Sequence, residues 1–422
     1  MEVTPFRGIR YNETVVGDVA KVICRPYDVI TPEQQTLYHK KSGYNAVRLE
    51  FPGPIADRYE RAATAFQRWL KQGVLQYDSA SAFYLHEHEF KYSDRKMIRR
   101  GVIARVRLEP WGSGIFPHEE TTSKAKTDRL QLMRTCRANF SPLLSLYEDS
   151  EREIATILCG VAKEGPVISL PAERSNFPDP DEAHRVWAVA DPDVKRELSD
   201  LLSAQPIYLA DGHHRYETAL TYRQERIQGA SPGDSGASDH VMMELVEFSD
   251  LGLVVLPLHR LVRGILPSRL VKLIDRFRDL FSVEVCALGT GSYYLPVDSC
   301  LGVLGLQPDS LLVLRRRQDV ALETMMPSSR SQAYRESCVS ILNHIVFEGI
   351  LSEAKDLEVA HTVDIDEARQ QVREGKHQLA FLLHPPDVKM IKAVADARDR
   401  MPAKSTYFYP KVPAGLVINP LD

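Results

Sequence analysis

Two histidines, an aspartate and an arginine lie close together in QPIYLADGHHRYETALTYRQ, residues 205–224. Pro206–Ala210 is a short apolar run typical of a buried strand, and the apolar residues from Tyr216 onward are spaced as on one face of a helix. The first N–H groups of a helix have no partner within the helix, and the helix dipole is positive there. A strand-to-helix turn at Asp211–Arg215 therefore predicts a site for a phosphate or a carboxylate.

The residues of this turn suit different tasks. Gly212 lets a ligand approach the backbone closely, and Arg215 offers a planar fork of donors that matches phosphate oxygens. Adjacent residues of a helix point about 100° apart, so His213 or His214 would contact the ligand, but not both. The sequence does not choose between them. In the alternative interpretation, Asp211 is only the N-cap of the helix and one histidine is a packed core ring.

The same turn could hold a metal ion. His213 and Glu217 are four residues apart, but they do not supply the three protein ligands that a catalytic zinc usually has. A hard cation such as Mg²⁺, held by Asp211 and by the substrate's own phosphates, fits better. Glu217 then remains a candidate for substrate binding.

A second carboxylate occurs in RPYDVI, where Arg25, Tyr27 and Asp28 follow a strand predicted at Val22–Cys24. A carboxylate at the end of a strand could take a proton from a substrate hydroxyl while the carboxylate at Asp211 binds metal. Arg25 and Tyr27 are candidates for substrate binding beside it. The alternative is that Asp28 is simply a turn residue after a proline.

Two further segments carry charged and hydroxyl side chains. His118 and Glu119 belong to the polar stretch PHEETTSKAKTDR, which could form a solvated loop or a lid over a substrate. Lys404, Ser405 and Thr406 precede an aromatic run in MPAKSTYFYPK, where they could bind another anion or only flank a final strand.

The elements that must position these residues alternate between helix and strand, which predicts a mixed α/β (α+β) fold. Thr31-Pro32-Glu33-Gln34 has the pattern of an N-cap, a proline in the first turn and a capping box, and residues 57–72 and 331–351 are expected to be helical. Two strands are expected within residues 81–90 and 97–110. With 422 residues the chain is too long for one ordinary core, and we expect one domain at residues 1–250 and a second at residues 251–422.

Composition narrows the classes of function. The chain has 57 acidic and 53 basic residues and a net charge of −4, so no nucleic acid or anionic membrane is expected as a partner. Six cysteines occur without a CxxC pair, which argues against a zinc finger or a disulfide framework. No run of about 18 apolar residues occurs, so we expect a cytoplasmic protein that binds a small molecule.

Familiar phosphate and hydrolase motifs are missing from the sequence. It contains no GxxxxGK[ST] loop, no HRD and DFG pair, no GxSxG elbow and no HExxH. A phosphate site at the DGHHR turn would therefore work without a familiar ATPase cradle.

Several longer motifs resemble a widespread prokaryotic family whose function is not known. The resemblance runs from Phe6 to about Pro420. The motifs that carry it are RPYDVI, YNAVRLE, the PHEET loop, DRLQLM with NFSPLLSLY, ADGHHRYETAL, LGLVVLPLHR and MPAKSTYFYPK.

The DGHHR turn is also similar to the Gly-x-x-Arg box of the superfamily that joins ParB-like proteins, sulfiredoxins and free serine kinases. This resemblance implies a ParB/sulfiredoxin-like N-terminal part that contains the strand-turn-helix, followed by a C-terminal α/β domain. It implies that Gly212 and Arg215 bind phosphate, and that an upstream acid, Asp28 or Glu50, acts on the serine hydroxyl. His213 and His214 occupy the turn where a sulfiredoxin would have its cysteine, so repair of oxidised thiols is not expected.

The leading hypothesis is a small-molecule kinase that transfers a phosphoryl group to a hydroxyl, with free L-serine giving O-phosphoserine as the foremost case. Its catalytic candidates are Asp211, His213, His214, Arg215 and Asp28. Mg²⁺ is the expected cofactor, and ATP, ADP or pyrophosphate remain open as donors. The alternatives are a nucleotide-binding regulatory module of ParB-like type without turnover, and a metal-dependent phosphoesterase.

Overall fold

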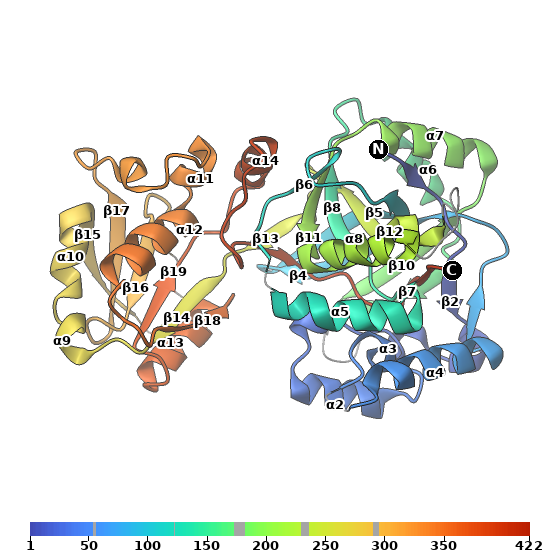
Figure 1. The fold of residues 1–422 in the computed structure, drawn as a ribbon, viewed down its shortest axis with the longest axis horizontal. Helices are drawn as coiled ribbons and strands as arrows, with labels where there is room; N and C mark the ends of the chain where they lie inside the picture. Colours follow the sequence, from blue (N-terminus) through green and yellow to red (C-terminus); the bar gives the residue numbers. More distant parts are fainter. Residues whose placement is uncertain (54–55, 122, 173–181, 229–235, 290–294) are drawn as a thin grey trace. The chain divides into compact units, whose positions relative to one another are not determined.

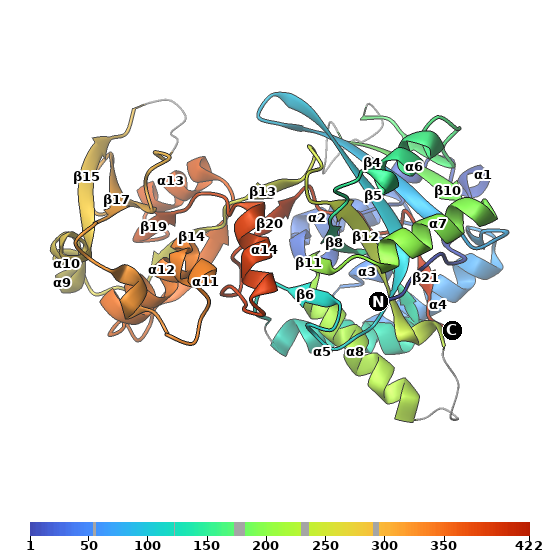
Figure 2. The same ribbon diagram turned by 90° about the horizontal axis from the view of Figure 1, so that it is seen from above.

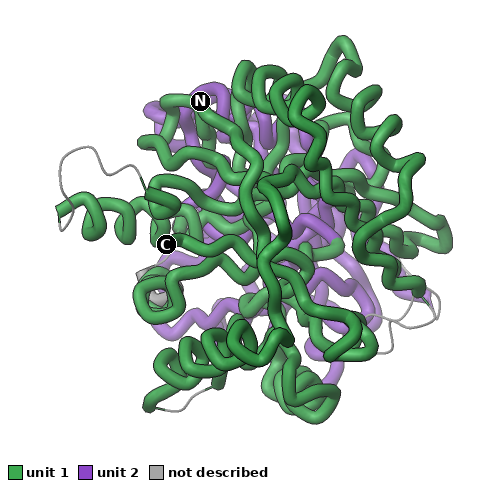
Figure 3. Tube along the Cα trace, turned by 90° about the vertical axis from the view of Figure 1, so that its right-hand side faces the viewer, with its two compact units in different colours: residues 1–117, 121–254, 410–422 green, residues 118–120, 255–409 purple. Residues whose placement is uncertain are grey.

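The chain forms two compact units in a computed structural model that describes residues 1–53, 56–121, 123–172, 182–228, 236–289 and 295–422 (Figure 3). Unit 1 comprises Met1–Pro117, Thr121–Val254 and Pro410–Asp422, and unit 2 comprises His118–Glu120 and Val255–Tyr409. The change of unit after Val254 lies near the predicted boundary between residues 250 and 251. The return of the last thirteen residues, 410–422, to unit 1 was not predicted.

A mixed β-sheet forms the centre of unit 1 (Figure 1). Its strands lie in the order β6-β11-β8-β12-β5-β4-β10-β9, and β1 pairs with β5. The β11–β6 and β12–β8 pairs are parallel, and the other neighbouring pairs are antiparallel. The strands are β1 (Val3–Thr4), β4 (Phe83–Tyr92), β5 (Arg95–Arg107), β6 (Ile115–Pro117), β8 (Leu143–Tyr147), β9 (Ile168–Leu170), β10 (Ala183–Val189), β11 (Ile207–Asp211) and β12 (His240–Glu247).

Both faces of this sheet are buried, because successive side chains of a strand point to opposite sides. On β4, Tyr84 belongs to a core shared with α3, α4 and α5, whereas Phe83 and Leu85 belong to a core shared with α6, α7 and α8. The helices are α1 (Glu13–Val16), α2 (Pro32–Lys41), α3 (Val47–Glu50), α4 (Arg58–Lys71), α5 (Ser123–Cys136), α6 (Glu153–Val161), α7 (Pro192–Ser203) and α8 (His213–Gln228), with 3₁₀ turns at η1 (Val19–Lys21), η2 (Tyr27–Val29) and η4 (Ala237–Asp239). Short ladders join β2 (Ile9–Tyr11) to β3 (Leu75–Tyr77) and β7 (Ala138–Asn139) to β21 (Asn419–Pro420).

Several local predictions are confirmed. The two strands expected within 81–90 and 97–110 form the long β4–β5 hairpin (Figure 2), which turns at Ser93 and Asp94 with φ of 47° and 60°. Positive φ at both central residues gives the turn a twist that matches the strands. Helix α2 begins after Thr31 with the predicted capping box to Gln34, and α4 covers the predicted helix at 57–72.

The strand predicted at Val22–Cys24 is wrong. Only Cys24 makes a β-bridge, to Ala414, and 3₁₀ turns lie before and after the segment. The Asn45 side chain donates from Nδ2 to the backbone oxygens of Lys21 and Ile23 at 2.8 and 3.0 Å. Because this amide takes carbonyl groups that a neighbouring strand would use, the segment stays irregular.

Unit 2 contains an antiparallel sheet in the order β15-β17-β16-β19-β14-β18. The helix predicted at 331–351 is interrupted, because Ser337 has extended backbone angles between α11 and α12. The elements are β13 (Val254–Leu256), β14 (His259–Arg263), α9 (Pro267–Leu270), α10 (Leu273–Leu280), β15 (Phe281–Ala287), β16 (Leu301–Leu304), β17 (Ser310–Arg316), η5 (Leu322–Met325), α11 (Gln332–Glu336), α12 (Cys338–Ile341), the π-helix η6 (Leu342–Ile350), β18 (Glu358–Thr362), α13 (Ile365–Arg373), β19 (Leu379–Leu382), α14 (Val388–Asp396) and β20 (Tyr407–Tyr409).

The mixed α/β class expected from the sequence is therefore confirmed. Among the described residues, no helix combines the length and the apolar character needed to cross a membrane.

Candidate functional site

The DGHHR motif lies at the predicted strand-to-helix turn. β11 ends at Asp211, α8 begins at His213, and Gly212 between them has a φ of 96°. A Cβ atom at Gly212 would lie 2.9 Å from Cγ of Leu143 and 3.0 Å from Nη2 of Arg215. Both the backbone angle and this close approach require glycine.

Arg215 is buried and its guanidinium contacts three groups of unit 1. Nη1 donates to the Ser141 hydroxyl at 2.9 Å and to the Pro142 backbone oxygen at 3.0 Å, and Nη2 donates to Oδ2 of Asp211 at 3.0 Å. The side chain thus points into the protein. Its fork is held in one orientation before any ligand binds.

Asp211 lies between two cations. Its Oδ2 accepts from Arg215, and its Oδ1 forms an ion pair with Lys411 Nζ, on the C-terminal segment that returns to unit 1. Burial raises the pKa of Asp211, but the charges of Lys411 and Arg215 outweigh burial and hold the pKa well below its usual range. Asp211 is therefore ionised, and its carboxylate bonds side-chain cations rather than acting only as a helix cap.

The two adjacent histidines differ in their surroundings. His213 is buried in the first turn of α8, and its charge also favours the ionised form of Asp211. His214 is only half-buried. The charge of His213 thus links one of the two predicted candidates to Asp211.

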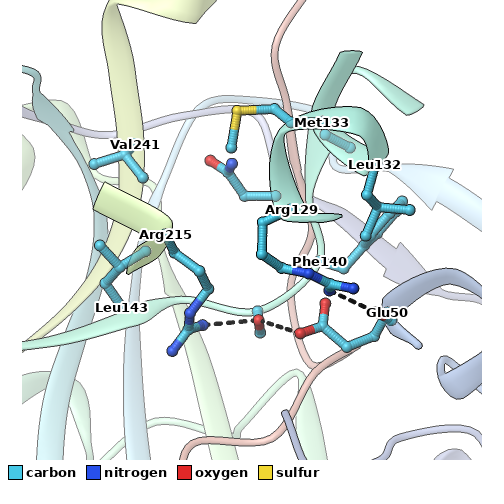
Figure 4. A pocket seen from close by; sticks show the side chains of 11 residues that line it. Glu50, Arg129, Leu132, Met133, Phe140, Leu143, Arg215 and Val241 are labelled. Atoms are coloured by element: carbon cyan, nitrogen blue, oxygen red, sulfur yellow. Dashed lines mark hydrogen bonds between the residues drawn. The ribbon is translucent and has the colours of Figure 1, made fainter. Parts of the chain in front are cut away.

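A small cavity lies beside Arg215 (Figure 4). Its volume is about 40 Å³, and its polar lining consists of Arg215 with Glu50, Arg129, Asn139 and Ser141. The Ser141 hydroxyl, which accepts from Arg215, donates to Oε1 of Glu50 at 3.0 Å, and Arg129 Nη1 donates to the Glu50 backbone oxygen at 2.7 Å. A space of this volume holds one or two waters, so it can take a small polar group but not a nucleotide.

Of the predicted RPYD residues, Tyr27 contacts Glu50 and Arg129, which line this cavity, whereas the charge of Arg25 acts on Glu182. The backbone N–H of Tyr27 donates to Oε1 of Glu50 at 3.4 Å, and the Arg129 guanidinium lies 4.0 Å from the centre of the Tyr27 ring. Asp28 is exposed. Burial lowers the pKa of Arg215, but the nearby carboxylates of Asp211, Asp28 and Glu50 outweigh it and raise the pKa.

Glu217, one turn further along α8, is held by the segment that follows the PHEE residues. It accepts from the Thr121 hydroxyl at 2.8 Å and from Lys126 Nζ at 2.6 Å. This pairing ties α8 to α5 in unit 1. Glu217 therefore has a structural role in addition to the substrate-binding role proposed for it.

The predicted residues of the PHEET and AKST segments meet in unit 2. Glu119 accepts from the backbone N–H groups of Lys404, Ser405 and Thr406 at 2.7, 3.2 and 3.3 Å, and the His118 ring nitrogen Nε2 lies 2.9 Å from the Thr406 hydroxyl. Lys404 has a φ of 65°, so successive N–H groups point toward one anion. The anion that this nest holds is the chain's own carboxylate.

A cluster of buried polar side chains in unit 1 was missed by the sequence reasoning. It spans β4, β5, β10 and β12. Its members are His86, His88, Arg99, Glu182, His184 and Glu244, each at most 8% exposed. The alternation in LHEHEF is the signal that could have found it, because period-two spacing places His86 and His88 on the same face of one strand. No comparable sequence pattern marks Lys411 as the partner of Asp211.

Fold and site together define an α/β protein with a buried, charged cluster at a strand-to-helix turn. The chain belongs to the family described as "Protein of unknown function (DUF1015)", whose profile matches residues 3–348. None of the curated proteins is significantly similar to the chain in sequence.

The chain is similar to several solved structures at low identity. A conserved hypothetical protein from Pyrococcus furiosus is 12% identical, with a TM-score of 0.35 over 74% of this chain and 93% of that one. A mutant free serine kinase in complex with AMP is also 12% identical, with a TM-score of 0.35 over 73% and 87%. C-terminally truncated SbnI from Staphylococcus aureus is 10% identical, with a TM-score of 0.34 over 73% and 84%. Likeness at this level does not bear on function.

Proposed function

We propose that the protein is a phosphotransferase that moves a phosphoryl group to the hydroxyl of a small molecule, with free L-serine as the acceptor to test first. The observation that carries the proposal is the buried Lys411–Asp211–Arg215 arrangement with Asp28 and Glu50 beside it. Phosphoryl transfer requires alignment of the groups, neutralisation of phosphate charge and a group that accepts the hydroxyl proton. Fixed cations next to two further carboxylates meet these requirements.

In this proposal Arg215 and the N-terminal end of α8 hold phosphate oxygens, with Gly212 allowing close approach. Arg25, Tyr27 and Glu217 contact substrate. His213 rather than His214 acts beside Asp211, because the charge of His213 bears on that carboxylate. The nest in unit 2 is formed by the backbone N–H groups of Lys404, Ser405 and Thr406, with His118 beside it. An anionic group could enter this nest only by displacing the Glu119 carboxylate.

Mg²⁺ and a donor among ATP, ADP and pyrophosphate belong to the same proposal. Asp211 was the expected magnesium ligand, but its oxygens already bond Lys411 and Arg215, so a cation there would have to displace Lys411. In this proposal the exposed carboxylate of Asp28 binds magnesium or acts as the base, and the buried carboxylate of Glu50 is the alternative for that role.

The direct test incubates the purified chain with Mg²⁺, L-serine and each donor in turn, and follows O-phosphoserine by mass spectrometry. Wild type is expected to form product with one donor, and Arg215→Lys to form at least about tenfold less, because lysine lacks the planar fork. The exposed Arg226→Ala on the same helix is the matched control and should keep wild-type activity. No product with any donor would overturn the serine kinase proposal.

A second candidate is a regulatory module of ParB-like type that binds a nucleotide without turnover. It is favoured by the fact that Arg215 already bonds Ser141, Pro142 and Asp211, so a bound anion would rearrange contacts within unit 1. Asp28→Asn and Glu50→Gln separate the two candidates. A kinase loses turnover but keeps ligand binding when its base is replaced. A binding module has no catalytic base, so its ligand binding should stay unchanged in both variants.

A further inference from the structure

The strongest unassigned feature is the buried histidine cluster on the central sheet of unit 1. His88 on β4 and His184 on β10 are cross-strand partners, and Glu182 precedes His184 by two residues. One ligand atom from each of Glu182, His88 and His184 lies within 4.8 Å of the other two. Two imidazoles and a carboxylate gathered in this way are a donor set typical of transition metals.

Hydrogen bonds behind His184 orient its ring. Oε1 of Glu244 lies 3.0 Å from Nδ1 of His86, and Nε2 of His86 lies 3.1 Å from Nδ1 of His184. With His86 neutral, its Nδ1–H donates a hydrogen bond to the Glu244 carboxylate, and its Nε2 accepts one from Nδ1–H of His184. The remaining nitrogen of His184, Nε2, then carries a lone pair. A carboxylate–histidine chain behind a ligand is the usual support of a metal-binding imidazole.

The sheet leaves room for this support. A Cβ atom at Gly101 on β5 would lie 2.5 Å from Cγ of Glu244, so glycine is needed for the Glu244 side chain to cross β5 toward His86.

The lone pair of His184 Nε2 faces another acceptor. Oε2 of Glu182 lies 3.9 Å away, too far for a hydrogen bond. Zinc lies about 2.0–2.1 Å from imidazole nitrogen and about 2.0–2.2 Å from carboxylate oxygen, so an ion between these two atoms would span nearly this gap. The third atom, Nε2 of His88, is 2.7 Å from the same carboxylate oxygen.

We propose that His88, Glu182 and His184 bind a divalent first-row transition metal, with Zn²⁺ as the probe and Glu244–His86 as the support of His184. In the arrangement seen here Arg99 Nη2 lies 3.3 Å from Nδ1 of His88, so the His88 proton is on Nε2. For Nε2 of His88 to bind the ion as part of a neutral imidazole, its proton moves to Nδ1, and the Arg99 guanidinium turns away from that atom. Magnesium is disfavoured, because it prefers oxygen ligands.

The proposed metal site could also bind a further ligand. Glu182 and Glu244 carry two negative charges, and Arg99 and Arg25, which both act on Glu182, carry two positive charges. A divalent ion therefore adds a net positive charge that an anionic ligand can offset. Three protein ligands leave the fourth tetrahedral position open to water, hydroxide or an anionic group of a small molecule. The inference goes beyond the proposed kinase and does not depend on it.

The test uses the full chain after treatment with a chelator and desalting. Zn²⁺ is titrated in competition with a chromophoric chelator, and bound metal is measured by elemental mass spectrometry. Wild type should bind one zinc ion per chain. Glu182→Gln and His184→Gln should weaken binding at least about 100-fold, and Glu244→Gln about 10- to 100-fold through the support of His184. His240→Gln on β12, outside the cluster, is the matched control.

Circular dichroism identifies any variant that does not fold. In that case the Co²⁺ spectrum of wild type decides, because nitrogen and oxygen ligands in a tetrahedral site give intense visible bands and hexaaquo cobalt does not. Wild type that binds no stoichiometric zinc, or variants that bind it as tightly as wild type, would overturn the proposal. Arg215→Lys should keep the zinc while losing transferase activity, so failure of the two proposals is distinguishable.

Discussion

Asp211 in unit 1 and Glu119 in unit 2 are both carboxylates held at predicted anion sites, but by different groups. Asp211 bonds two side-chain cations, Lys411 and Arg215, whereas Glu119 bonds a row of backbone N–H groups at residues 404–406. In unit 2 the donors of the nest are satisfied by the chain itself. In unit 1 further charged groups, Asp28 and Glu50, surround the pair and a cavity lies beside it.

A predicted anion site can therefore have a structural role or bind a ligand, and the groups around the site distinguish the two cases. A nest filled by a carboxylate of its own unit needs no ligand to be stable. A buried group of cations and carboxylates keeps its donors fixed by opposing charges, which is the preorganisation that binding of a charged substrate requires.

Replacement of Arg215 by methionine should cost about 3 kcal/mol of unfolding free energy, because Ser141, Pro142 and Asp211 lose a buried donor. Urea denaturation followed by circular dichroism measures this loss. The exposed Arg226→Met on the same helix is the control and should change stability by less than about 0.5 kcal/mol. Equal effects of the two substitutions would mean that the buried ion pair does not organise unit 1.

Replacement of Lys411 by methionine should cost about 2 kcal/mol at neutral pH and alter the response to acid. The folded pKa of Asp211 is depressed, so its contribution is fully present above the unfolded value of about 3.9 and is lost as the pH falls toward the folded value. Wild type should therefore lose stability progressively below about pH 5. In Lys411→Met this dependence should be weaker, because only the Arg215 charge then counteracts the rise in the Asp211 pKa that burial causes.

Denaturation curves between pH 3 and pH 8, with the exposed Lys71→Met as control, measure the effect. An unchanged acid response in Lys411→Met would show that the Lys411 charge does not hold the Asp211 pKa down.

Replacement of Glu119 by glutamine should cost about 1–2 kcal/mol, because a neutral amide accepts the backbone N–H groups less strongly than a carboxylate. Glu120→Gln is the neighbouring control, since the Glu120 carboxylate is 3.7 Å from Arg330 and its side chain is 46% exposed. Thermal unfolding measures both. A stabilised Glu119→Gln would contradict the structural role of the nest.

Replacement of Asp28 by asparagine should have the smallest effect on stability, within about 0.5 kcal/mol, because Asp28 is exposed. If Asp28 is the base, turnover should fall at least about 100-fold while donor binding stays within a few-fold of wild type. Kinetics and calorimetry on the same preparation measure the two effects. Full turnover in Asp28→Asn with loss in Glu50→Gln would transfer the role to Glu50.

The local part of the site could be predicted from the sequence. A short apolar run followed by helical periodicity locates the Asp211–Arg215 turn, and the pattern at Thr31–Gln34 locates the start of α2, because both depend on neighbouring residues. The strand at Val22–Cys24 failed for a different reason. Its apolar side chains are those expected of a buried strand. However, the Asn45 side-chain amide, more than 20 residues away in the sequence, donates to the backbone oxygens of Lys21 and Ile23.

Long-range pairings could not be predicted. Lys411 lies 200 residues from Asp211 in the chain, and no local pattern marks a lysine as the partner of a distant carboxylate. The histidine cluster depends on the register between β4 and β10, which sets His88 opposite His184. Alternation in LHEHEF shows which residues share a face, but Glu87 and Glu89 make the opposite face polar too, so the buried face stays undetermined.

The proposed function rests on the claim that Arg215 at the DGHHR turn binds the phosphate of a donor. Calorimetric titration of ATP, ADP and pyrophosphate in the presence of Mg²⁺ measures this binding. At least one donor should bind wild type and Arg226→Ala alike, and should bind Arg215→Lys at least about tenfold more weakly, although the positive charge is kept. Equal affinity for wild type and Arg215→Lys, or no binding of any donor to wild type, would contradict the claim.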